Sequence, residues 1–202
     1  MTPYAKGALI TLLGVTVISP DALLIRLMTI DSWSLIFWRG LLSGLAILIT
    51  LRIVSGRRFN ADVASMGWNG VWVTIVFALG SLCFVYAITH TYVANTLFLT
   101  ATSPIFAALI SRFIMKEHVT TRTWVAIGVT MVGIGVIASD GLSGARSIAG
   151  DIAALGAALS LAITFCIARA GRSVSMVPAM GFAGLLAALM VLPLTASLVV
   201  PT

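Results

Sequence analysis

The sequence predicts an all-α integral membrane protein with about seven transmembrane helices. Two features of composition lead to this fold class. Of the 202 residues, 60% are hydrophobic and only 9% are Asp, Glu, Lys or Arg, whereas a soluble domain carries about 25% charged residues. The mean hydropathy of +1.12 is too high for a fold of this size in water, because a soluble surface must be largely polar. The third feature is the pattern, in which polar residues fall in short clusters between long apolar segments.

A helix that crosses the hydrocarbon core of a bilayer needs about 20 apolar residues. On this length, the sequence predicts seven helices, at about 4–28, 33–54, 66–89, 93–115, 122–139, 150–169 and 178–200. Very short turns separate the first helix from the second and the third from the fourth. Residues 55–65 and 116–121 are expected to be polar loops, and 140–144 opens a Gly/Ser-rich connection.

Charge predicts the orientation, because Lys and Arg collect on the cytoplasmic side of membrane proteins. Alternate helix ends and loops hold nine of the 12 basic residues: Lys6, Arg52, Arg57, Arg58, Arg112, Lys116, Arg122, Arg169 and Arg172. Arg26 and Arg146 fall on the other side. We therefore expect a multi-pass protein of the cell (inner) membrane with a cytoplasmic N-terminus. The net charge of +6 does not indicate nucleic acid, because the basic residues do not form one face.

Small residues recur at four-residue steps, which lets helix backbones approach closely in lipid. The sixth predicted helix has Gly150, Ala154, Ala158, Ala162 and Cys166 at this spacing, and the second has Gly40 and Gly44. The first and sixth helices also resemble one another, since Gly7 and Arg26 are separated by the same 19 positions as Gly150 and Arg169. Five helices lie between the two starts, so the second copy would be inverted, as in many secondary transporters. Chance likeness between Gly/Ala/Leu helices is an equal alternative.

The stretch 87–138 carries a more specific resemblance. It contains an Ala-Asn step within 93–99, a Thr-Ser-Pro-Ile-Phe step within 102–109, a turn with Lys116-Glu117, and a Gly-rich helix through 128–136. In this order the chain resembles an EamA-type transporter of the drug/metabolite transporter superfamily. The resemblance implies ten helices in two inverted five-helix repeats, with both termini cytoplasmic. Residues 1–139 would form the first repeat and 140–202 the first two helices of the second, so on this resemblance we expect the chain to be C-terminally truncated.

Charged residues inside the membrane need a reason, and Asp21 and Arg39 are the first candidate site residues. Both lie roughly 9–12 Å below the outer surface at 1.5 Å per residue, so the two side chains are at a depth that allows an ion pair between neighbouring helices. In the functional interpretation Asp21 titrates during transport and Arg39 tunes it or attracts an anionic substrate group. The alternatives are a structural pair or side chains that extend to the headgroups.

The remaining candidates are a polar and aromatic set on three helices. Pro20 and Pro104 each remove a backbone donor, which opens a helix toward a cavity or only bends it. Asn95, Phe98 and Thr102 share one stripe of the fourth helix, and Tyr86 lies with Cys83 and His90 on a stripe of the third. These stripes either line a substrate cavity or make hydrogen bonds between helices. Glu117, in the loop after the fourth helix, is expected to be solvated.

The sequence predicts a transporter and no enzyme. The chain has six acidic residues and two His, without HExxH, P-loop or paired carboxylates, so we expect no catalytic residue, cofactor or metal. The predicted function is secondary transport of small metabolites by alternating access, with protons as a candidate coupling ion and activity incomplete in this chain. The expected partners are the lipid bilayer and a small-molecule substrate, and a homo-oligomer is a further candidate. The alternative is a non-transporting membrane fragment or a structural or assembly subunit of a larger complex.

Overall fold

The computed structural model describes residues 3–19, 25, 31–139, 147–171 and 174–194. Within this part of the chain the secondary structure is helical, without strands, which confirms the predicted fold class. The α-helices are α1 (Pro3–Ile18), α3 (Ser32–Ser55), α4 (Phe59–Ser65), α5 (Gly67–His90), α6 (Val93–Thr100), α7 (Ser103–Phe113), α8 (Thr121–Ser139), α9 (Ile148–Ala170) and α10 (Val177–Val191). Two 3-10 turns, η1 (Gly56–Arg58) and η2 (Leu192–Leu194), follow α3 and α10.

Length and hydropathy indicate which of these helices can cross a membrane. Four segments are long and apolar enough to cross a membrane, and shorter apolar helices occupy Ala5–Val17, Thr121–Val136 and Val177–Val191. Together they account for the seven apolar helices that the sequence predicts. The protein is therefore a multi-pass membrane protein.

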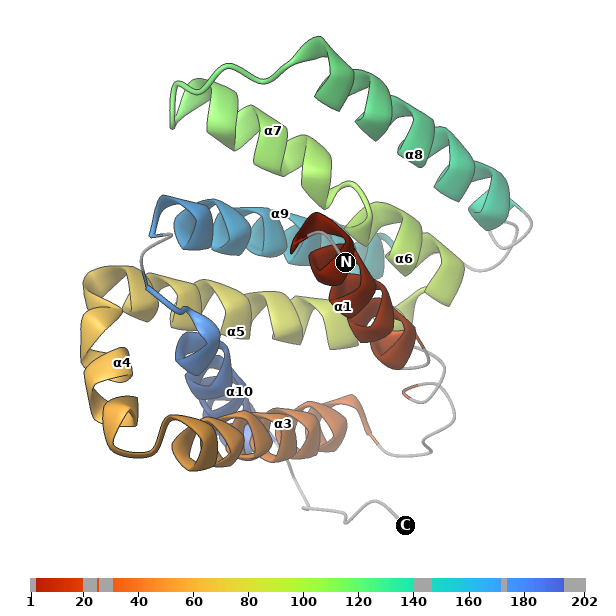
Figure 1. Cartoon of the computed structure of the whole chain (residues 1–202). Coiled ribbons are helices and arrows are strands. Elements are labelled where there is room, and N and C mark those ends of the chain that lie inside the picture. Colours follow the sequence, from red (N-terminus) through yellow and green to blue (C-terminus); the bar gives the residue numbers. More distant parts are fainter. Residues whose placement is uncertain (1–2, 20–24, 26–30, 140–146, 172–173, 195–202) are drawn as a thin grey trace.

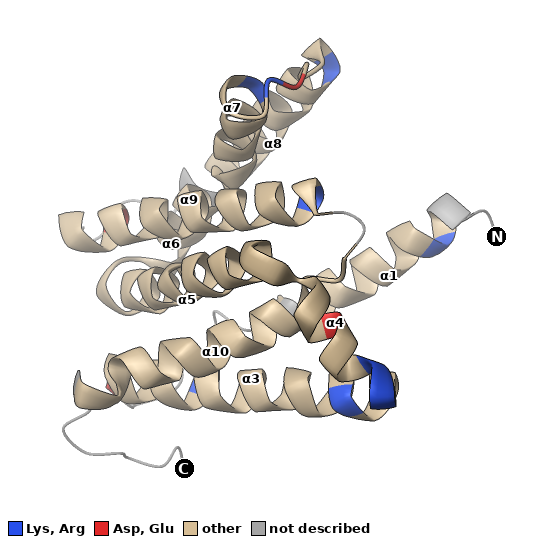
Figure 2. Cartoon of the chain, turned by 90° about the vertical axis from the view of Figure 1, so that its left-hand side faces the viewer, with Lys and Arg blue, Asp and Glu red and all other residues tan. Residues whose placement is uncertain are grey.

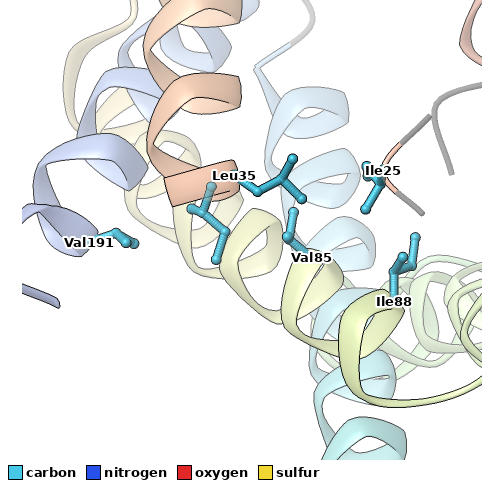
Figure 3. Close-up of a cluster of buried hydrophobic side chains, with 6 residues drawn as sticks. Ile25, Leu35, Val85, Ile88 and Val191 are labelled. Carbon is cyan, nitrogen blue, oxygen red and sulfur yellow. The ribbon is translucent and has the colours of Figure 1, made fainter. Parts of the chain in front are cut away.

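The helices form a layered bundle (Figure 1). The helices α5 and α9 lie side by side in its middle, with α3 and α10 on one side and α6, α7 and α8 on the other. One apolar core cluster joins Leu35 of α3, Val85 and Ile88 of α5, and Val191 of α10, with Ile25 against them (Figure 3). Along the α5–α9 contact the packing is by small side chains, since a Cβ atom on Gly80 would lie 2.7 Å from Ser160 Cβ.

Glycines set the crossing of α3 and α10. A Cβ atom on Gly40 would lie 2.5 Å from Gly184 O, and one on Gly184 would lie 2.7 Å from Gly40 O. A Cβ atom on Gly44 would likewise lie 2.7 Å from Gly181 O. The two backbones therefore touch where each helix has no side chain, as the small-residue spacing of Gly40 and Gly44 predicts.

The prediction of a polar loop at 55–65 is wrong, because the segment is helical. Gly56 turns the chain with a φ of 53°, and α4 then runs across the end of the bundle from α3 to α5 (Figure 1). Although the segment is polar in sequence, Val63 packs against a buried cluster that includes Met66 and Met176. One apolar side is enough to hold a short helix at this surface.

The fourth predicted helix, 93–115, is two helices with a break at Ala101 and Thr102. Pro104 lies in the first turn of α7, where its missing N–H and fixed φ are tolerated. The proline therefore starts a new helix instead of bending one. In the first predicted helix, α1 ends at Ile18; Pro20 and Asp21 lie outside the described residues, as do 195–200 of the seventh.

Candidate functional site

Charge is distributed unevenly along the bundle (Figure 2). The described Lys and Arg residues gather mostly around one end, formed by the end of α3 with η1, the turn between α7 and α8, the last turn of α9 and the start of α1. We call it the basic end. Asp31 and Asp151 lie at the opposite end, at the starts of α3 and α9.

Two polar side chains converge on Asp151 at the opposite end. Asn95 Nδ2 donates a hydrogen bond to Asp151 Oδ1, and Thr91 Oγ1 donates to the same oxygen at 3.2 Å. Asn95 is 2% exposed, and Thr91 is also buried. We call these three residues the Asp151 cluster. It joins the α5–α6 turn to the first turn of α9, so it ties predicted first-repeat helices to a predicted second-repeat helix.

The α5–α6 turn and the start of α9 position the three residues of the Asp151 cluster. Helix α5 ends at His90 and is capped by Thr91, whose N–H donates to Ala87 O at 2.9 Å. Extended backbone at Tyr92 then leads directly into α6. This tight turn puts Thr91 and Asn95 on the same side. On α9, Ser147 accepts from Gly150 N at 3.3 Å and caps the helix. A Cβ atom on Gly150 would lie 2.9 Å from Thr91 Cβ, so glycine lets Asp151 approach its donors.

A second polar link joins the same helix to the rest of the bundle at the basic end. Arg169 Nη2, in the last turn of α9, lies 2.8 Å from Glu117 Oε2. The left-handed conformation of Lys116, with a φ of 54°, turns the chain here, and Glu117 N donates to Ser111 O at 2.9 Å. Asp151 and Arg169 are 18 residues apart, which is about 27 Å along a helix and close to the thickness of the hydrocarbon core.

A cavity of about 480 Å³ lies beside this ion pair. It is formed by Pro104, Ala107, Ala108 and Ser111 of α7, by Phe165, Cys166 and Arg169 of α9, and by Glu117, His118, Val119, Thr120, Thr123 and Ile127 of the α7–α8 turn and α8. The Glu117–Arg169 pair is therefore part of its wall. A volume of this size is in the range of small-molecule sites.

The site residues predicted from the sequence lie in different parts of the bundle. Asn95 belongs to the Asp151 cluster, and Pro104 lines the cavity. Phe98 faces α8 instead, since its Cε2 atom would lie 3.6 Å from a Cβ atom on Gly135. Thr102 belongs to the break between α6 and α7, where its hydroxyl donates to Leu99 O at 2.6 Å. Asn95, Phe98 and Thr102 do not share one stripe, because the helix does not continue through Thr102.

Arg39 is half-buried on α3 and faces α5. Its Nη1 atom donates to Ser81 Oγ at 3.4 Å, and its guanidinium lies 6.0 Å from the centroid of the Phe84 ring. Asp21, its predicted partner, lies outside the described residues. Tyr86 stacks on His90, with ring centroids 4.0 Å apart, and lies 6.5 Å from the Trp33 ring. These aromatic residues gather near the opposite end.

Sequence reasoning missed the contacts of Asp151 and of Arg169 and expected Glu117 to be solvated. The available signal was that Asp151 lies in the first turn of an apolar helix, where a carboxylate needs partners. Glu117 and Arg169 are 52 positions apart, so only the packing of α9 against α7 brings them together.

The bundle of apolar helices defines a multi-pass membrane protein. A comparison with protein families matched residues 5–139 to the EamA-like transporter family. The chain belongs to this family, whose members are membrane transporters. No curated protein and no solved structure matched the chain.

Proposed function

We propose that the chain takes part in secondary transport of small metabolites by alternating access. The single observation that carries the mechanism is that α9 is linked to preceding helices near both of its ends. The Asp151 cluster forms one link and the Glu117–Arg169 pair forms the other. In this mechanism, one link opens while the other stays closed, and solute reaches the space between the helices from one side at a time.

The energies of these links suit a reversible gate. Hydrogen bonds between membrane helices contribute on average about 0.6 kcal/mol and at most about 1.7 kcal/mol. Exposed ion pairs contribute up to about 1 kcal/mol. Contacts of this strength change the relative populations of the open and closed states at each end without making either state permanent. A solute that binds these states with different affinities can therefore shift their populations.

We assign the first helices, residues 1–139, to one repeat and 140–202 to the start of an inverted second repeat. The reciprocal contact of Gly40 with Gly184 supports the assignment. Helices α3 and α10 are then the second helices of the two repeats, and a two-fold relation brings equivalent helices together in this way. The charge asymmetry supports an inner-membrane protein with its basic end and N-terminus in the cytoplasm.

Protons are the proposed coupling ion, and Asp21 is the carboxyl group proposed to carry them, because a charged residue within a membrane span needs a functional reason. The carboxylate of Asp151 accepts hydrogen bonds from Asn95 and Thr91, and its proposed role is to hold the link at that end.

Transport by the purified chain in proteoliposomes tests the function. With a panel of neutral and zwitterionic metabolites and a pH-sensitive dye inside the vesicles, we expect saturable uptake accompanied by proton movement for at least one solute. Asp21→Asn should abolish the pH-driven component while leaving the protein folded, and unchanged coupling in that variant would remove Asp21 from the mechanism. Absence of flux for every solute, with flux from a ten-helix relative in parallel, would contradict transport by this chain.

A second candidate function is that of a structural or assembly subunit. The observation that favours it is the surface of α1, whose described side chains from Lys6 to Val17 are exposed along the helix. Such a helix can pack against lipid, a partner protein or a second copy of the chain. Loss of flux together with a stable larger complex in mild detergent would support this candidate over a carrier.

A further inference from the structure

A basic hollow lies where α3 turns into α4 at the basic end of the bundle. Its volume is about 620 Å³, and it is lined by Val54, Ser55, Arg57, Arg58 and Asp62. We call these residues the α3–α4 corner. Figure 2 shows a concentration of positive charge where α3 turns into α4, and no residue of the corner belongs to the two links on α9.

The three arginines near this corner differ in their contacts. Arg52 is held by the protein, since its Nη1 atom donates to Gly56 O and its guanidinium lies 5.9 Å from the centroid of the Phe59 ring. Arg57 and Arg58 are exposed, and within the described residues no carboxylate lies at ion-pair distance from either. Asp62 also lines the hollow, so two positive groups face one negative group.

Apolar surface continues from the hollow along α3. Val54, which lines the hollow, is 79% exposed, and Ile53 is 76% exposed. Ile49, one turn further into the helix, is exposed as well. These side chains lead from the charged corner toward the middle of the span, along a surface that a hydrocarbon chain can cover.

Tryptophans mark the depth of the corner in the membrane. Trp68, 71% exposed, and Trp72 lie in the first turns of α5, with their rings 6.4 Å apart in an edge-to-face arrangement. Exposed Trp residues concentrate at the level of the lipid headgroups. Since α4 connects directly to this part of α5, the arginines of the α3–α4 corner lie at headgroup depth.

We propose that the α3–α4 corner binds one anionic phospholipid. The guanidinium groups of Arg57 and Arg58 hold the phosphate, because Arg presents paired donors that match phosphate oxygens. An acyl chain lies along Ile49, Ile53 and Val54. The apolar surface selects a lipid over free phosphate, and the two exposed positive charges select an anionic lipid over a zwitterionic one. The site does not depend on the proposed transport function.

Native mass spectrometry of the whole chain in detergent, with phosphatidylglycerol or phosphatidylcholine added, tests the site. We expect one phosphatidylglycerol to be retained more tightly than phosphatidylcholine. The double variant Arg57→Gln/Arg58→Gln should bind phosphatidylglycerol roughly thirtyfold more weakly, since each basic residue near a membrane surface contributes about fivefold. Millimolar inorganic phosphate should not displace the lipid, and its displacement of the lipid would overturn the assignment of the apolar surface.

Lys116→Gln/Arg122→Gln is the matched control, because it removes the same charge from the α7–α8 turn and the start of α8 at the same end. It should leave phosphatidylglycerol binding within about twofold of the original chain. An equal loss in the two double variants would show attraction by net charge alone and would overturn the site. The double variant Arg57→Lys/Arg58→Lys is the control for misfolding. It retains both charges and should keep most of the affinity, with an unchanged thermal transition.

Discussion

Asn95 links α6 to the carboxylate of Asp151, and removal of its amide leaves a half-buried acceptor with fewer donors. We expect Asn95→Ala to lower the free energy of unfolding by about 1–3 kcal/mol, the usual cost of an unsatisfied polar group. Unfolding in mixed micelles, followed by circular dichroism, measures the change.

A double-mutant cycle separates this link from general damage at Asn95. In an Asp151→Ala background, Asn95→Ala should cost less by roughly 1 kcal/mol, because the two residues interact directly. The control is Thr100→Val, which removes a hydroxyl bonded only within its own helix, to Thr96 O. Equal costs for Asn95→Ala in the two backgrounds would contradict the direct link.

At the residue scale, the sequence predicts part of the site. Asn95 is a candidate from sequence because a polar side chain in an apolar span needs a partner. The identity of that partner depends on how α9 packs beside α6, which no local pattern specifies. Phe98 shows the same limit, since the break at Thr102 decides which neighbours the α6 side chains meet.

Asp31 supports a pH-dependent contribution to stability at the start of α3. Its Oδ2 atom accepts from Ser34 N at 3.0 Å, and the hydrogen bonds from the Ser34 backbone and hydroxyl hold the pKa of Asp31 below its ordinary value of 3.8. The ionised cap therefore stabilises the helix fully above pH 3.8, and this contribution is lost as the pH falls through the lower pKa of the folded protein.

The corresponding substitutions separate capping from charge. Asp31→Ala should lower the thermal stability at neutral pH by the equivalent of about 0.5–2 kcal/mol. Asp31→Ser retains a cap that does not titrate, so it should keep most of the stability and lose the acid-dependent part. Thermal denaturation between pH 3 and pH 7 compares them. A pH profile for Asp31→Ser identical to that of the original chain would exclude Asp31 as the titrating group.

At the scale of elements, the crossing of α3 and α10 depends on glycine. Gly184→Ala places a methyl group against Gly40 O, so we expect a loss of about 1–3 kcal/mol, typical of overpacking. Gly128→Ala on α8 is the control, because nothing lies within 4 Å of its Cβ position. There the change should be neutral or stabilising by up to about 1 kcal/mol, because Ala favours a helix. The same sign at both positions in unfolding titrations would contradict the close crossing.

The sequence predicts the elements better than it predicts their ends. Apolar segments near 20 residues identify the spans, because lipid demands that length. The hydropathy pattern does not predict α4, because the segment is polar in sequence. Its one apolar side is evident only from the packing of Val63. The pattern fails again at Pro104, since a proline inside an apolar run begins one helix as readily as it bends another.

For the whole molecule, the two links on α9 should be coupled although about 27 Å of helix separates them. Alternating access requires that opening at one end favours closure at the other. Weakening the Glu117–Arg169 pair should therefore expose the cavity at the basic end, whereas weakening the Asp151 cluster should protect it. Cooperative loosening of the bundle makes a different prediction, because either change would then raise exposure at both ends.

Accessibility of one reporter position distinguishes these outcomes. Ser111→Cys, in a Cys83→Ser/Cys166→Ser background, places a thiol on the cavity wall. With a membrane-impermeant maleimide added from the basic side, Glu117→Gln should raise the labelling rate roughly fivefold and Asn95→Ala should lower it by a similar factor, as expected when each link contributes about 1 kcal/mol. The charge exchange Glu117→Arg/Arg169→Glu should return the rate toward the original value, because the opposite charges still face each other. Faster labelling in Asn95→Ala would show that the two links hold the bundle together without alternating.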